Sequence, residues 1–129
     1  MSPIVFQVLA LLLAAQQPGS PASADRKLIL DALHPVVEQR VGAPVEFVVT
    51  KLRVDGRWAF IQAEPQRPGG HRINGARYFP GSWADMDGLT TTAILRRQGK
   101  AWQVREWRIG ATDAWYCGLP NVGFDPCRK

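Results

Sequence analysis

Hydrophobic and polar residues alternate along two parts of the chain, and this alternation predicts four β-strands. The first pair of alternating runs covers residues 45–54 and 57–64, and an Asp-Gly step joins the two runs. The second pair covers residues 89–97 and 100–109, with a Gln-Gly step between them. Because alternating runs joined by a short glycine-containing turn are typical of β-hairpins, each pair is expected to form one hairpin.

Strict alternation also assigns the side chains of the first strand to two faces. The first face is then expected to carry Val48, Thr50, Leu52 and Val54, and the second Phe47, Val49, Lys51 and Arg53. Three tryptophans on the other strands, Trp58, Trp102 and Trp107, are expected to be core or sheet-face residues, because large aromatic side chains bury much apolar area.

Residues 25–41 follow a helical pattern. Aliphatic residues recur three or four positions apart and share one helix face, namely Ile29, Leu33, Val36 and Val37. Asp25 is expected to cap the start of this helix, and Gly42 is expected to end it. Pro35 lies inside the pattern and either kinks the helix or starts a second helix after His34.

The N-terminal segment, residues 1–24, has the layout of a secretory signal peptide. It carries no charged residue, is largely apolar over residues 4–15, and ends in a small-x-small cleavage signature at residues 22–24. The apolar stretch is too short to span a bilayer comfortably. Cleavage is therefore expected to leave residues 25–129 in the periplasm or outside the cell, without a stable membrane span. The absence of Lys or Arg before the apolar stretch leaves an uncleaved anchor or another start site as the alternative.

Two segments show no regular pattern. Residues 65–88 connect the hairpins and are long for a loop in a small domain, although a short helix or turn is expected around residues 83–86. Residues 110–129 form an irregular tail that contains both cysteines, Cys117 and Cys127. An even number of cysteines in an exported chain favours a disulfide between them over a redox or metal site.

The order of these segments predicts one α+β domain over residues 25–129. Because an isolated hairpin is marginally stable, the four strands are expected to join in one curved antiparallel sheet. The helix has the only long apolar stripe, so it is expected to pack on one face of this sheet, with a disulfide-stapled tail at the end. This architecture resembles cystatin-like and nuclear-transport-factor-2-like domains, a resemblance that implies a fold and not a function.

Four short stretches carry a further resemblance. They are WAFIQA (58–63), PQRPGG (65–70), WQV (102–104) and GATD (110–113). With them, most of the mature chain resembles a group of small exported proteins of Gram-negative bacteria. The resemblance implies an exported α+β domain without an assigned activity. It implies no functional residue, and it does not extend to the disulfide-bonded tail.

The charge of the chain restricts its partners. The formal net charge is +5 and the sequence pI is about 9.8. Such a balance is typical of proteins that bind nucleic acid or an anionic membrane surface, but export argues against nucleic acid. The basic residues are spread along the chain, which favours a solvated basic surface over a dedicated anion site. Adhesion to anionic polymers of the cell envelope is a weaker hypothesis.

Catalytic candidates are few. The chain has two histidines and none of the common nucleophile, paired-carboxylate or zinc motifs, and no cofactor or metal is expected. His34 lies on the predicted helix and is expected to be structural. His71 lies in the long loop, where it could act as an acid or base with Asp85 or Asp113. The alternative hypothesis is therefore a small cone-shaped α+β enzyme with its site at the open end of the sheet.

Aromatic residues and arginines concentrate in the long loop and the tail. They either cover the open end of the core or form a binding surface, and both hold if they frame a pocket. The leading hypothesis is therefore a non-catalytic domain that binds an unknown protein or small-molecule ligand in the cell envelope. The predicted binding residues, drawn from both segments, are His71, Arg72, Tyr78, Trp83, Trp115 and Tyr116.

Overall fold

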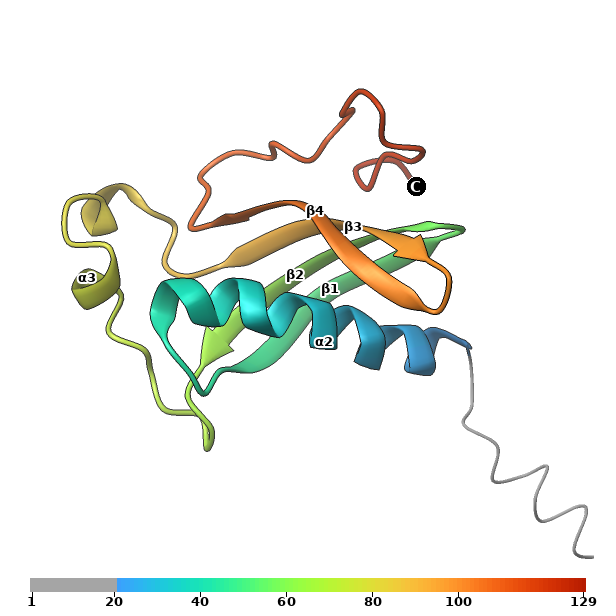
Figure 1. Ribbon diagram of the computed structural model, residues 1–129. Coiled ribbons are helices and arrows are strands. Elements are labelled where there is room, and N and C mark those ends of the chain that lie inside the picture. The colour runs from blue at the N-terminus through green and yellow to red at the C-terminus, as the bar shows by residue number, and fades with distance from the viewer. Residues whose placement is uncertain (1–20) are drawn as a thin grey trace, which may run out of the picture.

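The protein, described over residues 21–129 by a computed structural model, consists of one long helix, one sheet, a long connection and an irregular C-terminal tail (Figure 1). The helix lies along one face of the sheet, and the tail runs across the other face. Residues 1–20, which hold most of the predicted signal segment, lie outside the described part, so cleavage and export stay predictions. Over residues 21–129, no helix is long and apolar enough to cross a membrane.

Helix α2, Pro21–Val41, buries one face against the sheet. The fully buried side chains on this face recur every four positions and are Ile29, Leu33, Val37 and Val41. The helix continues through Pro35, so the alternative of a second helix starting after His34 is wrong. It ends as predicted at Gly42, which has a φ of +76° and donates its N–H to the carbonyl oxygen of Glu38 at 2.8 Å.

Asp25 does not cap this helix, because the helix begins at Pro21 and Asp25 lies within it. The carboxylate of Asp25 instead accepts hydrogen bonds from Nη2 of Arg97 and, at 3.2 Å, from Nε1 of Trp102. The Asp25 side chain is only 12% exposed. Since a buried carboxylate is costly unless it is paired and hydrogen-bonded, this contact anchors α2 to the second hairpin.

The sheet has the predicted four strands in the antiparallel order β1-β2-β3-β4. The strands are β1 (Glu46–Asp55), β2 (Trp58–Gln66), β3 (Thr91–Gln98) and β4 (Ala101–Ile109). The predicted α+β fold, with one helix on a sheet made from two hairpins, is therefore confirmed. The predicted strand ends differ from these bounds by about two residues at most.

Each hairpin turn begins on its glycine, one residue later than the sequence pattern suggested. Gly56 and Gly99 have φ values of +59° and +61°, and the residues after them have negative φ. A positive φ at only the first turn position is the type II′ arrangement, which matches the twist of the flanking strands. The second turn positions, Arg57 and Lys100, are therefore exposed at the two hairpin tips.

The predicted faces of β1 are wrong, because strict alternation does not hold along the whole strand. The pairing of β1 with β2 shifts between Val49 and Lys51, which leaves Thr50 as an extra residue in a β-bulge. One extra residue reverses the side-chain phase. Hydrophobic residues from both sides of the bulge therefore pack against the same core, namely Phe47, Val49, Leu52 and Val54.

Strand β4 uses the same device. Its pairing with β3 shifts between Ile94 and Leu95, and Arg105 is the extra residue. The hydrophobic side chains before and after this bulge all belong to the core under α2, and they are Trp102, Val104, Trp107 and Ile109. Both outer strands thus bend at a bulge, as edge strands often do.

The two central strands bury side chains on both faces of the sheet. Under α2 they present fully buried residues that are partly alanines, which leave room for the helix: Ala59, Ile61, Ala63, Ala93 and Leu95. On the opposite face Phe60 and Ile94 are also fully buried. Full burial of such a side chain contributes about 1.5–3 kcal/mol, so the opposite face also needs a cover.

The C-terminal tail supplies that cover. The ring of Tyr116 lies 4.4 Å from the ring of Phe60, between centroids, and Nε1 of Trp115 donates a hydrogen bond to Oγ1 of Thr92 at 2.8 Å. Further along the tail, Gly123 lies against the indole of Trp58 so closely that any side chain there would overlap it. The tail is therefore packed on the sheet along much of its length.

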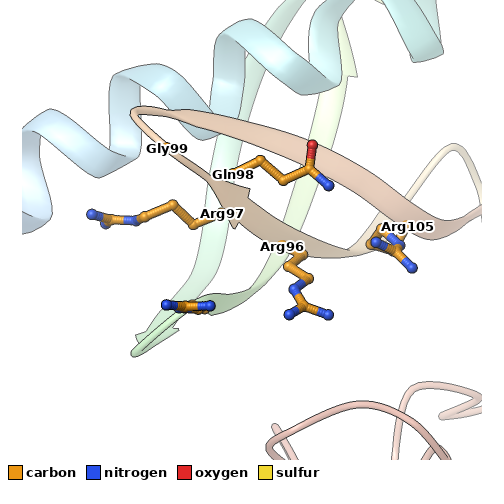
Figure 2. A pocket seen from close by; sticks show the side chains of 6 residues that line it. Arg96, Arg97, Gln98, Gly99 and Arg105 are labelled. Atoms are coloured by element: carbon orange, nitrogen blue, oxygen red, sulfur yellow. The ribbon is translucent and has the colours of Figure 1, made fainter.

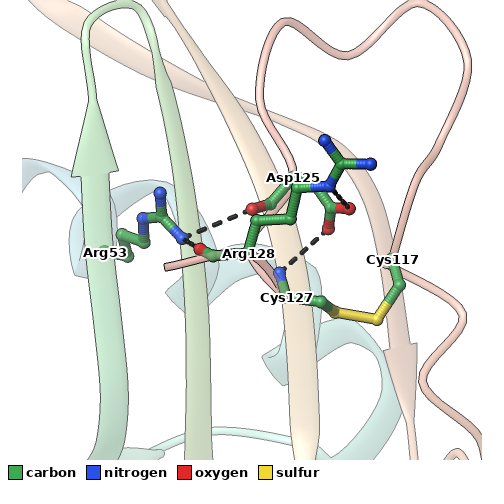
Figure 3. A network of polar contacts seen from close by, with 5 residues as sticks. All are labelled: Arg53, Cys117, Asp125, Cys127 and Arg128. Carbon is green, nitrogen blue, oxygen red and sulfur yellow. Dashed lines mark hydrogen bonds and ion pairs between the residues drawn. A yellow bond between two sulfur atoms is a disulfide. The ribbon is translucent and has the colours of Figure 1, made fainter.

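Two further features hold the end of the tail (Figure 3). The predicted disulfide between Cys117 and Cys127 is confirmed and closes the last part of the chain into a loop. Nη1 of Arg53, on β1, donates hydrogen bonds to the carbonyl oxygens of Asp125, at 3.3 Å, and Arg128. The disulfide loop is thereby attached to the first hairpin as well as to itself.

The connection between the hairpins is shorter than predicted, because β2 continues through Pro65. The pairing of β2 with β3 ends at Ala63, so the missing N–H of this proline costs no hydrogen bond to β3. Two short helices, α3 (Gly75–Tyr78) and η1 (Trp83–Asp85), divide the rest of the connection. Helix η1 confirms the predicted helix or turn in this part.

Arg67 joins this connection to the end of α2. Its Nη2 donates hydrogen bonds to the carbonyl oxygen of Val41 at 2.6 Å and to Oη of Tyr78 at 3.0 Å. Its Nη1 donates to the carbonyl oxygens of Gly42 at 2.8 Å and Pro44 at 3.1 Å. The guanidinium thus satisfies carbonyl groups that the end of a helix leaves without intrahelical partners.

Replacing Arg67 with Ala is expected to lower the free energy of unfolding by about 2–4 kcal/mol. Hydrogen bonds from a charged group contribute about 1.5–3 kcal/mol, and the carbonyl groups would lose their donor. Tyr78→Phe, which removes one hydroxyl, is expected to cost about 1 kcal/mol. Urea denaturation measures both, with Arg72→Ala as an exposed control. A cost of Arg67→Ala no larger than that of the control would contradict this role.

Candidate functional site

The predicted binding residues of the long connection do not form one cluster. His71 is exposed, and its carbonyl oxygen accepts a hydrogen bond from the N–H of Arg67 at 2.8 Å in a tight turn. Tyr78 is held by Arg67 at the end of α2. Arg72 and Trp83 both line an open cavity of about 410 Å³ beside the end of β2. Trp83 also packs against the core under the helix.

The predicted residues of the tail lie on the other face of the sheet. Trp115 and Tyr116 stack edge to face, with ring centroids 5.7 Å apart, over the face that carries Phe60. The guanidinium of Arg108 lies 4.8 Å from the centroid of the Trp115 ring. Aromatic residues of the loop and of the tail therefore pack on opposite faces of the sheet.

The predicted acid–base residues do not line one common cavity. Asp113 lines a cavity of about 220 Å³ on the tail face, together with Tyr116. Within residues 21–129, neither His71 nor Asp85 lines this cavity. They also do not line the cavity beside Arg72 and Trp83 or the two cavities lined by Arg105. His34 lies elsewhere, with its two ring nitrogens each 2.9 Å from a backbone carbonyl oxygen, those of Leu30 and Val45.

A larger cavity lies at the tips of the two hairpins, and four arginines line it (Figure 2). It has a volume of about 630 Å³. The residues that line this cavity, called here the arginine pocket, are Arg57, Arg96, Arg97, Gln98, Gly99 and Arg105. Five of them belong to the second hairpin, and the pairing of β2 with β3 brings Arg57, from the first hairpin, beside them.

Three of the four arginines of the pocket are placed by local features of the backbone. Arg57 occupies the second turn position of the first hairpin, and its carbonyl oxygen accepts the N–H of Arg97 at 2.7 Å. Arg96 pairs with Trp58 across the sheet, and its guanidinium lies 5.2 Å from the centroid of that indole ring. Arg105 is the bulge residue of β4. Turn, cross-strand pair and bulge thus direct three side chains to one cavity.

The electrostatics of the four arginines differ. Arg97 forms an ion pair with Asp25, and Figure 2 shows its side chain extending away from those of Arg96 and Arg105. Within residues 21–129, no hydrogen bond or ion pair to a protein acceptor is formed by the guanidinium groups of Arg57, Arg96 and Arg105. The pocket therefore has three positive charges that no protein carboxylate neutralises.

This arrangement suits an anion. A guanidinium group presents N–H donors in a planar fork that matches the oxygens of phosphate, sulfate or carboxylate, and it is less strongly hydrated than an ammonium group. Three such groups around one concavity also repel one another, and an anion between them would relieve that repulsion. Gln98 adds a neutral amide to the rim.

Reasoning from the sequence missed this site because the arginines are dispersed along the chain. A signal was nevertheless present in the two outer strands. In β4, Arg105 and Glu106 interrupt the alternation of hydrophobic residues, as Thr50 and Lys51 do in β1. Two polar residues in succession between alternating hydrophobic residues indicate a bulge. The side chain of an arginine at a bulge is then expected to depart from the alternating directions of the strand.

Comparison with known proteins gives no match, whether with protein-family models, with curated proteins or with solved structures. The resemblance to small exported proteins of Gram-negative bacteria therefore stays a prediction.

Replacing Asp25 with Asn is expected to destabilise the protein by about 2–3 kcal/mol, because the change leaves the partly buried Arg97 without its counter-charge. Asp31→Asn is the matched control, since it breaks the exposed ion pair with Lys27 and should cost less than about 0.5 kcal/mol. Chemical denaturation of both variants gives the difference. Equal costs would show that the Asp25 contact is not the anchor of α2.

Proposed function

We propose that the protein is an exported, non-catalytic domain that binds an anionic ligand in the arginine pocket. The observation that carries this proposal is the convergence of Arg57, Arg96 and Arg105 on one cavity of about 630 Å³ without a protein acceptor. Arginines that serve only solubility do not need to lie around one cavity, because like charges repel and placing them close together costs electrostatic energy. A bound phosphate, sulfate or carboxylate group supplies the missing counter-charge.

Export is proposed from two independent features. The N-terminal segment has the layout of a signal peptide, and the only two cysteines of the chain are joined in a disulfide, which persists in oxidising compartments. The periplasm or the extracellular space is thus the proposed location. The ligand is then a component of the cell envelope or of the medium, whether free or part of a protein.

The loop and the tail have less support as the binding site. Only Arg72 and Trp83 of the predicted set share a cavity, and the other predicted residues are engaged in structural contacts or lie apart from it. The acid–base hypothesis has less support still, because no cavity described above is lined by both His71 and an aspartate. The arginine pocket is therefore preferred over both.

Titration with inorganic phosphate and pyrophosphate tests the proposal. The purified exported protein is expected to bind pyrophosphate at one saturable site, with a change in the indole N–H signal of Trp58, which lies beneath Arg96. Arg96→Gln and Arg105→Gln are each expected to weaken binding by about ten-fold or more, because a charge-assisted hydrogen bond contributes at least about 1.5 kcal/mol.

Arg72→Gln is the matched control, because it removes the same charge from the far end of the sheet. It should leave the affinity unchanged within about two-fold, since exposed charges that lie more than a Debye length apart are largely screened at physiological salt. Equal losses in all three variants would indicate general electrostatic adhesion and contradict a defined site. A loss in Arg72→Gln alone would move the site to the long connection.

A further inference from the structure

A second cavity of about 270 Å³ shares one wall with the arginine pocket, because Arg105 lines both. Its floor is the sheet, where Ile94 is fully buried. Its other wall is the part of the tail that the disulfide encloses. The lining residues contributed by the tail are Leu119, Pro120, Asn121 and Val122.

The chemistry of this second cavity differs from that of the arginine pocket. Leu119 and Val122 are aliphatic and only partly buried, so they offer apolar surface to the cavity, whereas Ile94 is fully buried and offers none. Covering partly exposed apolar surface in a concavity with an apolar group is favourable, because water is released from both surfaces. A small apolar group therefore fits against Leu119 and Val122, while Arg105, Glu106 and Asn121 make the rest of the lining polar.

The one acidic residue in the lining reinforces this difference. Glu106 lines the second cavity but not the arginine pocket, and within the described residues its carboxylate has no ion-pair partner. A second anionic group on the ligand would be repelled by it. The pair of cavities thus carries several arginines at one end and two exposed aliphatic side chains with one acidic residue at the other, and Arg105 lies between them.

From this polarity, and resting on the proposed function, we infer that the ligand is an amphiphilic anion. Its phosphate, sulfate or carboxylate group binds Arg57, Arg96 and Arg105, and its apolar chain or ring enters the cavity beside the disulfide-closed loop, against Leu119 and Val122. The ligand carries its charge at one end only.

The disulfide has a defined role in this proposal. The cavity wall at residues 119–122, which carries Leu119 and Val122, has no regular structure, and it lies between Cys117 and Cys127. Two contacts place the loop on the sheet, namely Gly123 against Trp58 and the ring of Phe124 5.7 Å from the guanidinium of Arg53. A cross-link limits the conformations that this loop can adopt and so holds the wall beside the arginine pocket.

The experiment compares inorganic phosphate with a series of alkyl phosphates from methyl to octyl, each kept below the concentration at which it forms micelles. Affinity for the exported protein is expected to rise by about three-fold for each methylene group that enters the cavity, and then to level off when the cavity is full. Leu119→Asn should flatten the series while leaving the affinity for inorganic phosphate within about two-fold. Val122→Ser is a second variant with the same expectation.

Leu28→Asn is the matched control, because it removes an exposed leucine from helix α2, on the other side of the sheet. It should leave the whole series unchanged. Replacing both cysteines with serine should reduce the dependence on chain length more than the affinity for inorganic phosphate. The indole N–H signal of Trp58 and the far-ultraviolet circular dichroism spectrum show whether each variant is folded.

The outcomes separate the two proposals. Phosphate binding that depends on Arg96 but is independent of chain length would overturn the amphiphile and leave the anion site intact. A dependence on chain length that persists in both Leu119→Asn and Val122→Ser would overturn the assignment to this cavity. Failure of every phosphate to bind would overturn the proposed function itself. Sedimentation with anionic lipid vesicles, without binding of any monomeric alkyl phosphate, would replace a single-molecule ligand by a membrane surface and so overturn the inference.

Discussion

A sheet that is apolar on both faces must be covered on both, and this constraint determines the rest of the structure. Ile61 and Leu95 point to one face, and Phe60 and Ile94 point to the other, and all four are fully buried. The chain has only one long helix in its described part, and α2 covers one face. The irregular tail has to cover the second, which explains why it is aromatic and cross-linked.

A cover without regular structure leaves gaps at its margins, and the candidate sites lie there. The tail packs tightly where Tyr116 meets Phe60, and a cavity of about 270 Å³ lies where residues 119–122 approach the sheet. The tips of the two hairpins lie beyond this cavity, and the four arginines of the arginine pocket line the space beside them. The proposed ligand site therefore follows from how the second face is covered. No additional helix or strand is needed to form it.

Much of the fold follows from the sequence. Period-two alternation located four strands, a period near four located the helix, and glycines located both turns and the end of α2. The errors have specific physical causes. Asp25 was assigned to a cap because caps are local, whereas its real partners, Arg97 and Trp102, are distant in the sequence. Strict alternation failed at Thr50 because a bulge reverses the phase of every later side chain.

The sequence predicts which types of residue are present near the candidate site, but it does not predict their arrangement. The sequence by itself determined a basic chain, two hairpins with basic residues beside their turns, and a cysteine pair in an aromatic tail. Only the tertiary structure decided that Arg97 is neutralised by Asp25 while Arg57, Arg96 and Arg105 are left to share one cavity. The reason is physical. Local patterns specify which face a side chain takes, but charge pairing depends on distances between strands and helix that no local pattern contains.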